Sequence, residues 1–175
     1  NKQANIYPDK INMSLDGTQF YINYKKEKVK INTHLIGDFN ISNILASILI
    51  CDTIGIKINK IADSINQFYS VPGRFESYKK EDGGVIIVDY AHTPDAFDKI
   101  LSVIKNISPN KKIISLFGCG GNRDFKKRPI MAKISEKYSN QVIITDDNPR
   151  YEDPQEIIRQ IISGFSFKNY KIIND

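Results

Sequence analysis

The spacing of apolar residues divides the chain into two parts with different predicted structures. Residues 19–30 alternate between apolar and polar side chains around a lysine-rich turn, which is typical of a β-hairpin. Residues 40–54 and 58–68 instead carry apolar side chains at helical spacing, so we expect two amphipathic helices there. The sequence VPGR at residues 71–74 ends this pattern, because proline and glycine terminate helices and favour turns. We therefore place a domain boundary between residues 72 and 73.

After this boundary, short apolar runs alternate with amphipathic stretches. The alternation predicts strands at residues 85–88, 113–117, 142–145 and 170–173, and helices at residues 96–104, 130–138 and 157–165. Strands that alternate with helices are typical of an α/β fold, so we read the four strands as one parallel sheet.

Two of the predicted helices have clear start signals. Thr93 is a suitable N-cap with Pro94 at the first helical position. Asp153, Pro154 and Glu156 fit a capping box with proline at its first position. Both helices should therefore begin at these residues.

Composition places the chain among soluble globular proteins. Hydrophobic residues make up 41% of the 175 positions and charged residues 26%, and no apolar run is long enough to span a membrane. The stretch after Asn1 lacks the pattern of a signal peptide, and Cys51 and Cys119 are too far apart for a CxxC site, so we expect a cytoplasmic protein.

The net charge of +5 is compatible with nucleic-acid or phosphate binding, but its distribution favours neither. The basic residues, among them Lys126, Lys127 and Arg128, are scattered and not interleaved with aromatic ones, so we assign most of the basic residues to solvated surface. Nucleic-acid binding is the weakest of the functional hypotheses.

Candidate chemistry lies in the loops that follow the predicted strands, because ligands of open parallel sheets bind beyond the carboxyl ends of the strands. Three such loops are unusual: DYAHTPD at residues 89–95, GCGGNRD at residues 118–124 and DDNPR at residues 146–150. Together they describe a crevice with charges of both signs, which suits a small zwitterion or a phosphate.

Each loop also has a simpler interpretation. The glycine-rich segment is either a flexible turn or a phosphate-binding loop; it is not a Walker A loop, although Arg123 at its end can grip a carboxylate or phosphate. His92 is either a surface residue or a group whose protonation Asp89 tunes. Asp147 is either a turn residue or, with Arg150, part of a site for the ammonium and carboxylate of an amino acid. His34 lies in no comparable cluster, and we assign it no function.

Five sequence blocks together resemble the Mur ligase family. They are GDFNISNILA at residues 37–46, VPGRFE at 71–76, VDYAHTPDA at 88–96, FGCGGNRD at 117–124 with KRP at 127–129, and TDDNPRYEDP at 145–154. Their order and spacing cover nearly the whole chain from Gly37 onward. Among the family, the chain is most similar to the members that add the third amino acid of the peptidoglycan peptide.

The resemblance implies a three-domain, ATP- and Mg²⁺-dependent amide ligase of cell-wall biosynthesis. It would add meso-2,6-diaminopimelate to UDP-N-acetylmuramoyl-L-alanyl-D-glutamate through an acyl phosphate. Residues 1–72 would be the end of the central ATP-binding domain and residues 73–175 an incomplete Rossmann-like domain that binds the amino acid. The Walker A loop and the UDP-binding domain would lie before Asn1, so we expect this piece to be inactive alone, to expose apolar surface and to act within a cytoplasmic monomer.

Site residues follow by position in the family motifs. Asn40, Asn43 and Arg74 match residues near the nucleotide, and Asp89 and His92 match the loop that faces the ATP site as catalytic candidates. Arg123, Asp147, Asn148 and Arg150 match the amino-acid pocket, and no residue is assigned to a metal. The resemblance further implies that Arg150 selects diaminopimelate, because a guanidinium can hold the additional carboxylate that lysine lacks.

Two other interpretations remain open. Another member of the superfamily, such as a lysine-adding Mur ligase, folylpolyglutamate synthetase or cyanophycin synthetase, would share the fold but is expected to differ in the YAHTPD and DNPR blocks. A non-catalytic module that binds an amino acid would explain the lack of a Walker loop in these residues.

Overall fold

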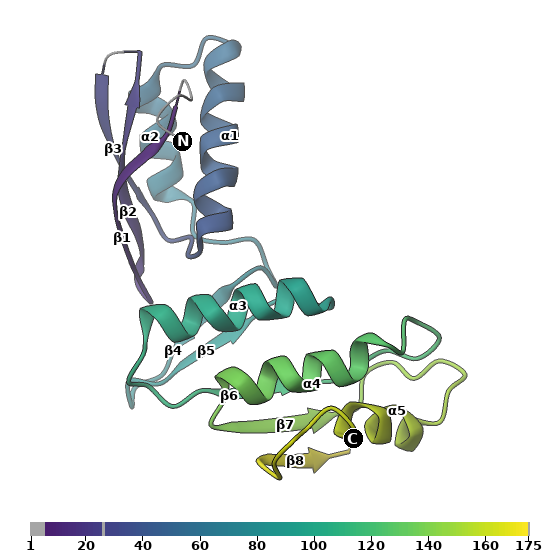
Figure 1. Ribbon diagram of the computed structural model, residues 1–175. Helices are drawn as coiled ribbons and strands as arrows, with labels where there is room; N and C mark the ends of the chain where they lie inside the picture. Colours follow the sequence, from purple (N-terminus) through teal and green to yellow (C-terminus); the bar gives the residue numbers. More distant parts are fainter. Residues whose placement is uncertain (1–5, 26, 175) are drawn as a thin grey trace. The chain divides into compact units, whose positions relative to one another are not determined.

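The chain forms two compact units in its computed structural model, Asn1–Tyr90 and Ala91–Asp175 (Figure 1). The structure describes residues 6–25 and 27–174. Each unit has a hydrophobic core of its own. None of the helices in these described ranges has the length and apolar character that a membrane span requires.

The first unit contains an antiparallel meander of β1 (Pro8–Ser14), β2 (Gly17–Tyr24) and β3 (Glu27–Thr33), with β2 in the centre. The predicted hairpin is confirmed as β2 and β3, in which Phe20, Ile22 and Ile31 are fully buried. The edge strand β1 was not predicted. Its residues are largely exposed and its register shifts between Asp9 and Asn12, so its sequence lacks the alternation that marks a strand with one buried face.

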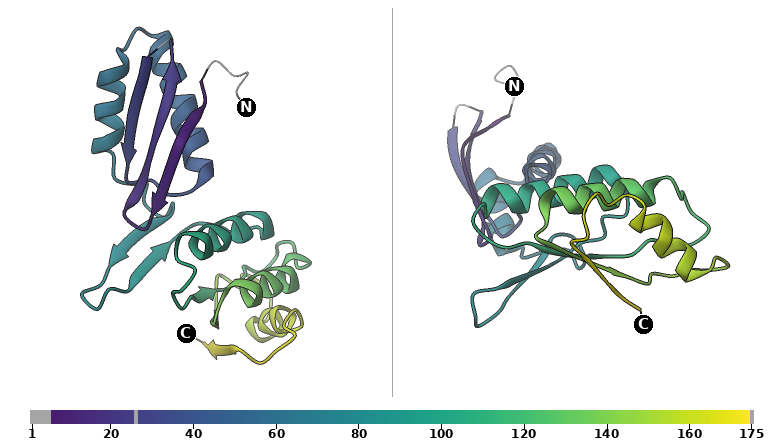
Figure 2. Two further views of the ribbon diagram at one scale, coloured as in Figure 1. Left: turned by 60° about the vertical axis from the view of Figure 1, so that its left-hand side comes forward. Right: turned by 60° about the horizontal axis from the view of Figure 1, so that its bottom comes forward.

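Helices α1 (Asp38–Thr53) and α2 (Ile58–Gln67) cover one face of this sheet (Figure 2). Ile41, Ile44 and Ile48 of α1 share the core with the strands, as their helical spacing predicts. Gly37 begins α1: its φ of 105° suits glycine, and its carbonyl accepts a hydrogen bond from the Asn40 amide at 2.9 Å.

Strand β5 (Val85–Val88) corrects one sequence prediction. We expected it in the parallel sheet, but it pairs antiparallel with β4 (Glu76–Lys79), which was not predicted, and both belong to the first unit. The turn between them is held by Gly84, whose amide donates to Asp82 Oδ1 at 2.9 Å and whose carbonyl accepts from the Lys80 amide at 2.8 Å. A hairpin between neighbouring strands closes only a short loop, which favours this pairing entropically.

The second unit is a parallel three-stranded sheet covered by helices. Its elements in order are α3 (Pro94–Ile107), β6 (Ile114–Phe117), α4 (Lys127–Tyr138), β7 (Gln141–Thr145), α5 (Pro154–Ile162) and β8 (Tyr170–Ile173). The strand order is β6-β7-β8, and both pairings are parallel. The alternation of strands and helices predicted for this part of the chain is therefore confirmed.

The helices of the second unit pack on one face of the sheet (Figure 1). Phe117 and Ile144 face them and are buried, and the Phe117 ring packs against Phe97 of α3 with ring centroids 5.1 Å apart. Ile114 and Leu116 point to the opposite face and are 61% and 63% exposed. The apolar surface expected from the sequence is present on this second face.

The predicted helix caps are confirmed at both positions. Thr93 Oγ1 accepts from the Ala96 amide at 3.3 Å, and Asp153 Oδ1 accepts from the Gln155 amide at 3.0 Å. The capping-box role predicted for Glu156 needs correction, because its carboxylate accepts from Gln160 at 3.0 Å and pairs with Arg159 at 2.9 Å.

The difference between the two sheet faces gives a first prediction. Ile144→Ala should lower the free energy of unfolding of the chain by about 2–5 kcal/mol, because it leaves a cavity in a closed core. Ile114→Ala removes the same atoms from an exposed position on the neighbouring strand and should cost about 1 kcal/mol or less. Urea unfolding followed by circular dichroism compares the two variants, and equal losses would contradict the one-sided packing of this sheet.

Candidate functional site

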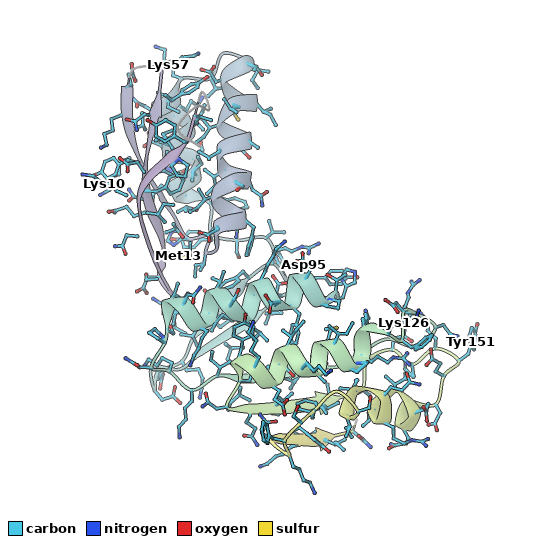
Figure 3. The ribbon with its side chains drawn as sticks, in the orientation of Figure 1. Lys10, Met13, Lys57, Asp95, Lys126 and Tyr151 are labelled. Carbon is cyan, nitrogen blue, oxygen red and sulfur yellow. The ribbon has the colours of Figure 1, made fainter. Side chains whose placement is uncertain are left out.

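The loops that follow β6 and β7 lie directly against each other. We call residues 118–124 the glycine loop and residues 146–153 the DNPR loop. The Gly121 amide donates to the Asn148 carbonyl at 2.9 Å, and the Tyr151 amide donates to Asn122 Oδ1 at 3.0 Å. In Figure 3, Tyr151 marks the tip of the DNPR loop and Lys126 the residue that precedes α4. Two loops that are separate in sequence therefore form one structure at the carboxyl edge of the sheet.

The glycines allow this close approach. A Cβ atom at Gly118 would lie 2.5 Å from the Thr145 carbonyl oxygen, and one at Gly121 would lie 1.8 Å from the Pro149 carbonyl oxygen. Both distances are shorter than van der Waals contact, so side chains at these positions would separate the loops. The sequence left a flexible turn and a phosphate loop as alternatives, whereas the structure gives these glycines a packing role.

Asp147 and Arg150 come together beside Gly120. A Cβ atom at Gly120 would lie 2.8 Å from Arg150 Nη1 and 3.5 Å from Asp147 Oδ2. The Arg150 guanidinium donates to the Gly121 carbonyl at 2.7 Å, which uses one of its five N–H donors. The structure thus brings a carboxylate and a guanidinium to the same stretch of backbone, as the zwitterion hypothesis requires.

Asn148 forms local hydrogen bonds with both Asp147 and Arg150. Its Oδ1 atom accepts from the Arg150 amide at 3.1 Å, while its own amide donates to Asp147 Oδ1 at 2.7 Å. Arg150 has a φ of 52°, in the left-handed region that costs a non-glycine residue roughly 1–2 kcal/mol. The asparagine therefore acts on the conformation of Arg150 through local hydrogen bonds.

Arg123 and His92 lie on exposed segments of the same unit. Arg123 belongs to the glycine loop, and Asp124 beside it accepts from the Lys126 amide at 2.9 Å. His92 precedes α3, and its carbonyl accepts from Lys127 Nζ at 2.6 Å. Because Lys127 begins α4 directly after the glycine loop, this bond ties the His92 segment to the same edge of the sheet.

Asp89, the other catalytic candidate, belongs to the first unit. Its Oδ2 atom accepts from the Phe75 amide at 2.7 Å, and Phe75 has a φ of 47°. The neighbouring Tyr90 amide donates to the Gly73 carbonyl at 2.8 Å. Asp89 therefore stabilises the turn at residues 71–76 that the sequence predicts from its proline and glycine.

Arg74 projects from this turn. Its guanidinium lies over the Tyr90 ring, 5.2 Å from the ring centroid, which is the geometry of a cation–π contact. Its amide donates to the Val71 carbonyl at 3.0 Å. The side chain is therefore oriented by an aromatic contact while remaining exposed.

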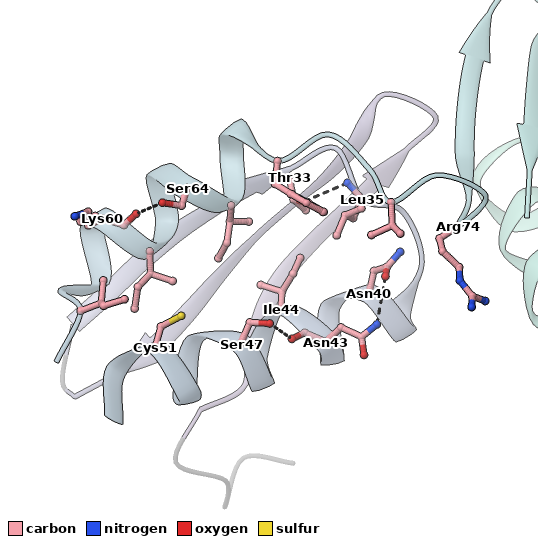
Figure 4. Close-up of a pocket in the computed structure, with 15 residues that line it drawn as sticks. Thr33, Leu35, Asn40, Asn43, Ile44, Ser47, Cys51, Lys60, Ser64 and Arg74 are labelled. Atoms are coloured by element: carbon pink, nitrogen blue, oxygen red, sulfur yellow. Dashed lines mark hydrogen bonds between the residues drawn. The ribbon is translucent and has the colours of Figure 1, made fainter. Parts of the chain in front are cut away.

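The three predicted nucleotide-site residues line one cavity of about 480 Å³ in the first unit (Figure 4). Asn40 Nδ2 donates to the Ile36 carbonyl at 2.8 Å, and its Oδ1 atom accepts from Asn43 Nδ2 at 3.4 Å. Arg74 lies at the end of the cavity beyond these two amides. The remaining wall is largely apolar and includes Leu35, Ile44, Ile65, Phe68 and Val71. Polar groups also lie elsewhere in its lining, including Lys60 and Ser64, so the cavity suits a small ligand with both apolar and polar parts.

Arg128 is buried, although most basic residues of the chain were expected to be solvated. Its side chain is 0% exposed and forms an ion pair with Glu152 at 2.8 Å. Neither residue was predicted as part of the site. A helical arginine next to two lysines gives no local signal of burial, so only the tertiary structure identifies the pair.

Two further side chains have packing roles. Burial raises the pKa of the Cys119 thiol to about 11, so the thiol is protonated at neutral pH and unsuited to act as a nucleophile. The His34 ring stacks on Tyr69 with centroids 4.2 Å apart. This contact gives His34 a packing role, and its lack of a catalytic function stays a prediction.

Comparison with known proteins connects both units to one family. Residues 73–175 match the sequence model of the Mur ligase glutamate ligase domain, and residues 1–51 match that of the Mur ligase middle domain. The chain is 40% identical over 178 residues to UDP-N-acetylmuramoyl-L-alanyl-D-glutamate–2,6-diaminopimelate ligase 1 of Clostridium acetobutylicum, covering 99% of this chain and 36% of the relative. The ligase of Rickettsia rickettsii that is named for the same reaction is 42% identical over 162 residues, or 92% of this chain and 33% of the relative.

Solved structures extend the likeness to the fold. A UDP-N-acetylmuramoyl-L-alanyl-D-glutamate–2,6-diaminopimelate ligase matches 100% of this chain and 36% of its own, with a TM-score of 0.69 and 32% identity. A folylpolyglutamate synthase of Thermotoga maritima matches 98% of this chain and 40% of its own, with a TM-score of 0.78 but only 21% identity, which shows the fold alone. This chain spans only 36% of the length of its relative from Clostridium acetobutylicum. Since one family domain matches residues 73–175, more than half of the chain, the chain belongs to the Mur ligase family.

Proposed function

We propose that this chain is part of an ATP-dependent ligase that adds meso-2,6-diaminopimelate to UDP-N-acetylmuramoyl-L-alanyl-D-glutamate in peptidoglycan synthesis. The observation that carries the proposal is the position of Asp147 and Arg150 beside Gly120, in a chain whose relatives are named for this reaction. The chain itself provides the end of an ATP-binding domain and an amino-acid-binding domain. We retain the division between these domains at residues 72 and 73, although the compact units divide after Tyr90.

The reaction joins a carboxylate to an amine, which requires activation of the carboxylate. A carboxylate oxygen of the dipeptide attacks the γ-phosphorus of ATP, ADP leaves, and an acyl phosphate forms. The amine of diaminopimelate then attacks the acyl carbon, phosphate leaves with the bonding electron pair, and the amine nitrogen loses a proton. Phosphoryl transfer depends mainly on positioning and on cationic groups that balance the developing charge, so the protein must hold three substrates in register.

Arg150 supplies the selection of the amino acid in this proposal. One end of diaminopimelate carries a carboxylate that lysine lacks, and a guanidinium can bind it through two parallel hydrogen bonds. Asp147, which lies beside the same glycine, suits the ammonium group of that end. Arg123, an exposed residue of the glycine loop, is a further candidate for contact with the amino acid. Lysine would leave the guanidinium without its partner, and an unpaired charge in a site is costly.

The cavity of the first unit suits the nucleotide. Its apolar wall is appropriate for the adenine ring, and the amides of Asn40 and Asn43 can recognise the ring edge. Arg74, oriented by Tyr90, is then a cation for the phosphates. Asp89 and His92 belong to the segment that joins the two units and are our candidates for contact with the transferred phosphoryl group.

Magnesium is expected to accompany ATP, held by phosphate oxygens with one or two carboxylates. Within residues 6–25 and 27–174, no three His, Cys, Asp or Glu side chains gather into a group that could hold a metal ion. We assign no step to a metal held by these residues. We propose a cytoplasmic monomer that binds small molecules and neither nucleic acid nor membrane.

The role of Arg150 gives a second prediction, to be tested in the full-length ligase. Arg150→Ala should raise the KM for meso-diaminopimelate about 10–100-fold, because it removes a charge-assisted pair of hydrogen bonds. Arg150→Lys should fall between Arg150→Ala and the wild type, since an ammonium keeps the charge but not the two-pronged geometry. The measurement is amino-acid-dependent ADP release with UDP-muramoyl dipeptide.

The matched control is Arg159→Ala, which removes an exposed arginine of α5 that pairs with Glu156. It should leave the KM for diaminopimelate within about twofold of the wild type, as surface ion pairs contribute little. A wild-type preference for lysine, or an Arg150→Ala variant that keeps the wild-type KM, would be incompatible with this account of specificity.

The nucleotide cavity gives a third prediction. Asn43→Ala removes an amide from the cavity wall and should raise the KM for ATP about tenfold, with the KM for the amino acid unchanged. Ser42→Ala changes the adjacent residue of α1, whose hydroxyl donates to the Asp38 carbonyl, and should leave both constants near the wild-type values. If the Asn43→Ala variant bound ATP normally, the assignment of this cavity to the nucleotide would be wrong.

A further inference from the structure

Arg128 of α4 is the most deeply buried charged group in the described part of the chain, with a side chain that is 0% exposed. Its guanidinium makes three hydrogen bonds. Nη1 donates to Glu152 Oε2 at 2.8 Å and to Gln160 Oε1 at 2.7 Å, and Nη2 donates to the Gly120 carbonyl at 3.1 Å. One side chain therefore joins α4 to the DNPR loop, to α5 and to the glycine loop.

Glu152 of the DNPR loop also contacts the glycine loop directly. While its Oε2 atom accepts from Arg128, its Oε1 atom accepts from the Asn122 amide of the glycine loop. The hydrogen bond from Arg128, reinforced by the one from the Asn122 amide, lowers the pKa of the Glu152 carboxyl, so it is ionised at neutral pH. The ion pair thus holds the glycine loop at Gly120 through the arginine and at Asn122 through the glutamate.

The residue between these two points is Gly121, whose carbonyl accepts the hydrogen bond from Arg150 at 2.7 Å. The ion pair therefore fixes both flanks of the peptide that orients the Arg150 guanidinium. Arg150 itself has a strained φ of 52°, and such a conformation persists only where its surroundings determine it. The link from Arg128 to Arg150 passes through one short piece of backbone.

Stability alone does not explain a guanidinium at this position. A buried ion pair is on average no more stabilising than well-packed apolar residues of similar volume, because both charges lose their hydration. In addition, Arg128 Nε is buried without a hydrogen-bond partner among the described residues, which is a further cost. The rigid, forked guanidinium can instead donate to the DNPR loop, the glycine loop and α5 at the same time.

We propose that Arg128 is a positioning residue for recognition of the amino-acid substrate. Together with Glu152, it holds the glycine loop and the DNPR loop in the arrangement that presents Arg150 and Asp147. This inference rests on the proposed function for the identity of the substrate, but the role of the ion pair does not depend on which amino acid the enzyme uses. Neither residue needs to touch the substrate.

The test is steady-state kinetics of the full-length ligase with Arg128→Lys, which keeps the charge and loses the fork. The KM for diaminopimelate should rise about tenfold or more, because a displaced Arg150 no longer meets the carboxylate. The KM for ATP should stay within about twofold of the wild type, since Glu152, Gln160 and Gly120, to which Arg128 donates, are not among the residues that line the nucleotide cavity. Arg159→Lys is the matched control, as it makes the same change at an exposed arginine of α5 and should alter neither constant.

A second variant keeps the inference testable if Arg128→Lys does not fold. Glu152→Gln changes a side chain that is 27% exposed and retains a hydrogen-bonding group of the same shape, so it should fold and raise the same KM to a smaller extent. Hydrogen exchange at the Gly121, Asn122 and Tyr151 amides should become faster in both variants if the loops separate.

The results of these experiments distinguish a failure of the positioning role from a failure of the proposed function. If the variants fold and keep the wild-type KM for the amino acid, the positioning role is wrong. If the KM for ATP rises together with the KM for the amino acid, while kcat and the melting temperature fall, Arg128 is only structural. If the wild type uses lysine rather than diaminopimelate, the proposed function fails, and the same comparison made with lysine still decides the role of Arg128.

Discussion

The second unit depends on two loops whose backbones lie closer together than side chains would permit. Gly118 and Gly121 make the approach possible, since a Cβ at either position would overlap a carbonyl oxygen of the neighbouring segment. Hydrogen bonds from the Gly121 amide to the Asn148 carbonyl and from the Tyr151 amide to Asn122 Oδ1 hold the two loops in register. The ion pair between Arg128 and Glu152 adds hydrogen bonds to backbone groups on both sides of Gly121.

This arrangement places charges of both signs at one edge of a small parallel sheet. The core beneath it is apolar and closed, so the loops rest on a support that does not rearrange easily. Within the loops, Asn148 and the backbone of Gly121 determine the orientation of Arg150. The proposed selection between amino acids that differ by one carboxylate would require such a support, because a guanidinium that moves by an ångström loses its two-pronged geometry.

The candidate site of the first unit is a cavity. This cavity has a mostly apolar wall, with the Asn40 and Asn43 amides and Arg74 at one end. The amides come from the first turns of α1, whose N-cap is Gly37, and the arginine comes from the turn that Asp89 stabilises. Each unit therefore combines a rigid apolar support with polar groups at a helix start or a loop, which is the usual division of labour in ligand sites.

The sequence by itself determined what depends on local pattern. The helices, most strands, the caps at Thr93 and Asp153 and the family resemblance all follow from residues close together in the chain. The edge strand β1 lacked this pattern, and its pairing became visible only in the fold. The partner of β5 was also undetermined, because an apolar run specifies burial but not which neighbour it pairs with.

Only the tertiary structure decided how distant residues combine. Asn40 and Arg74 share a cavity although more than thirty positions separate them, and Asp147 reaches Gly120 across α4 and β7. The clearest case is Arg128, whose sequence neighbourhood gives no sign that it is buried. Arginine is normally exposed, and its burial becomes favourable only when Glu152, Gln160 and a backbone carbonyl converge on it from three separate segments.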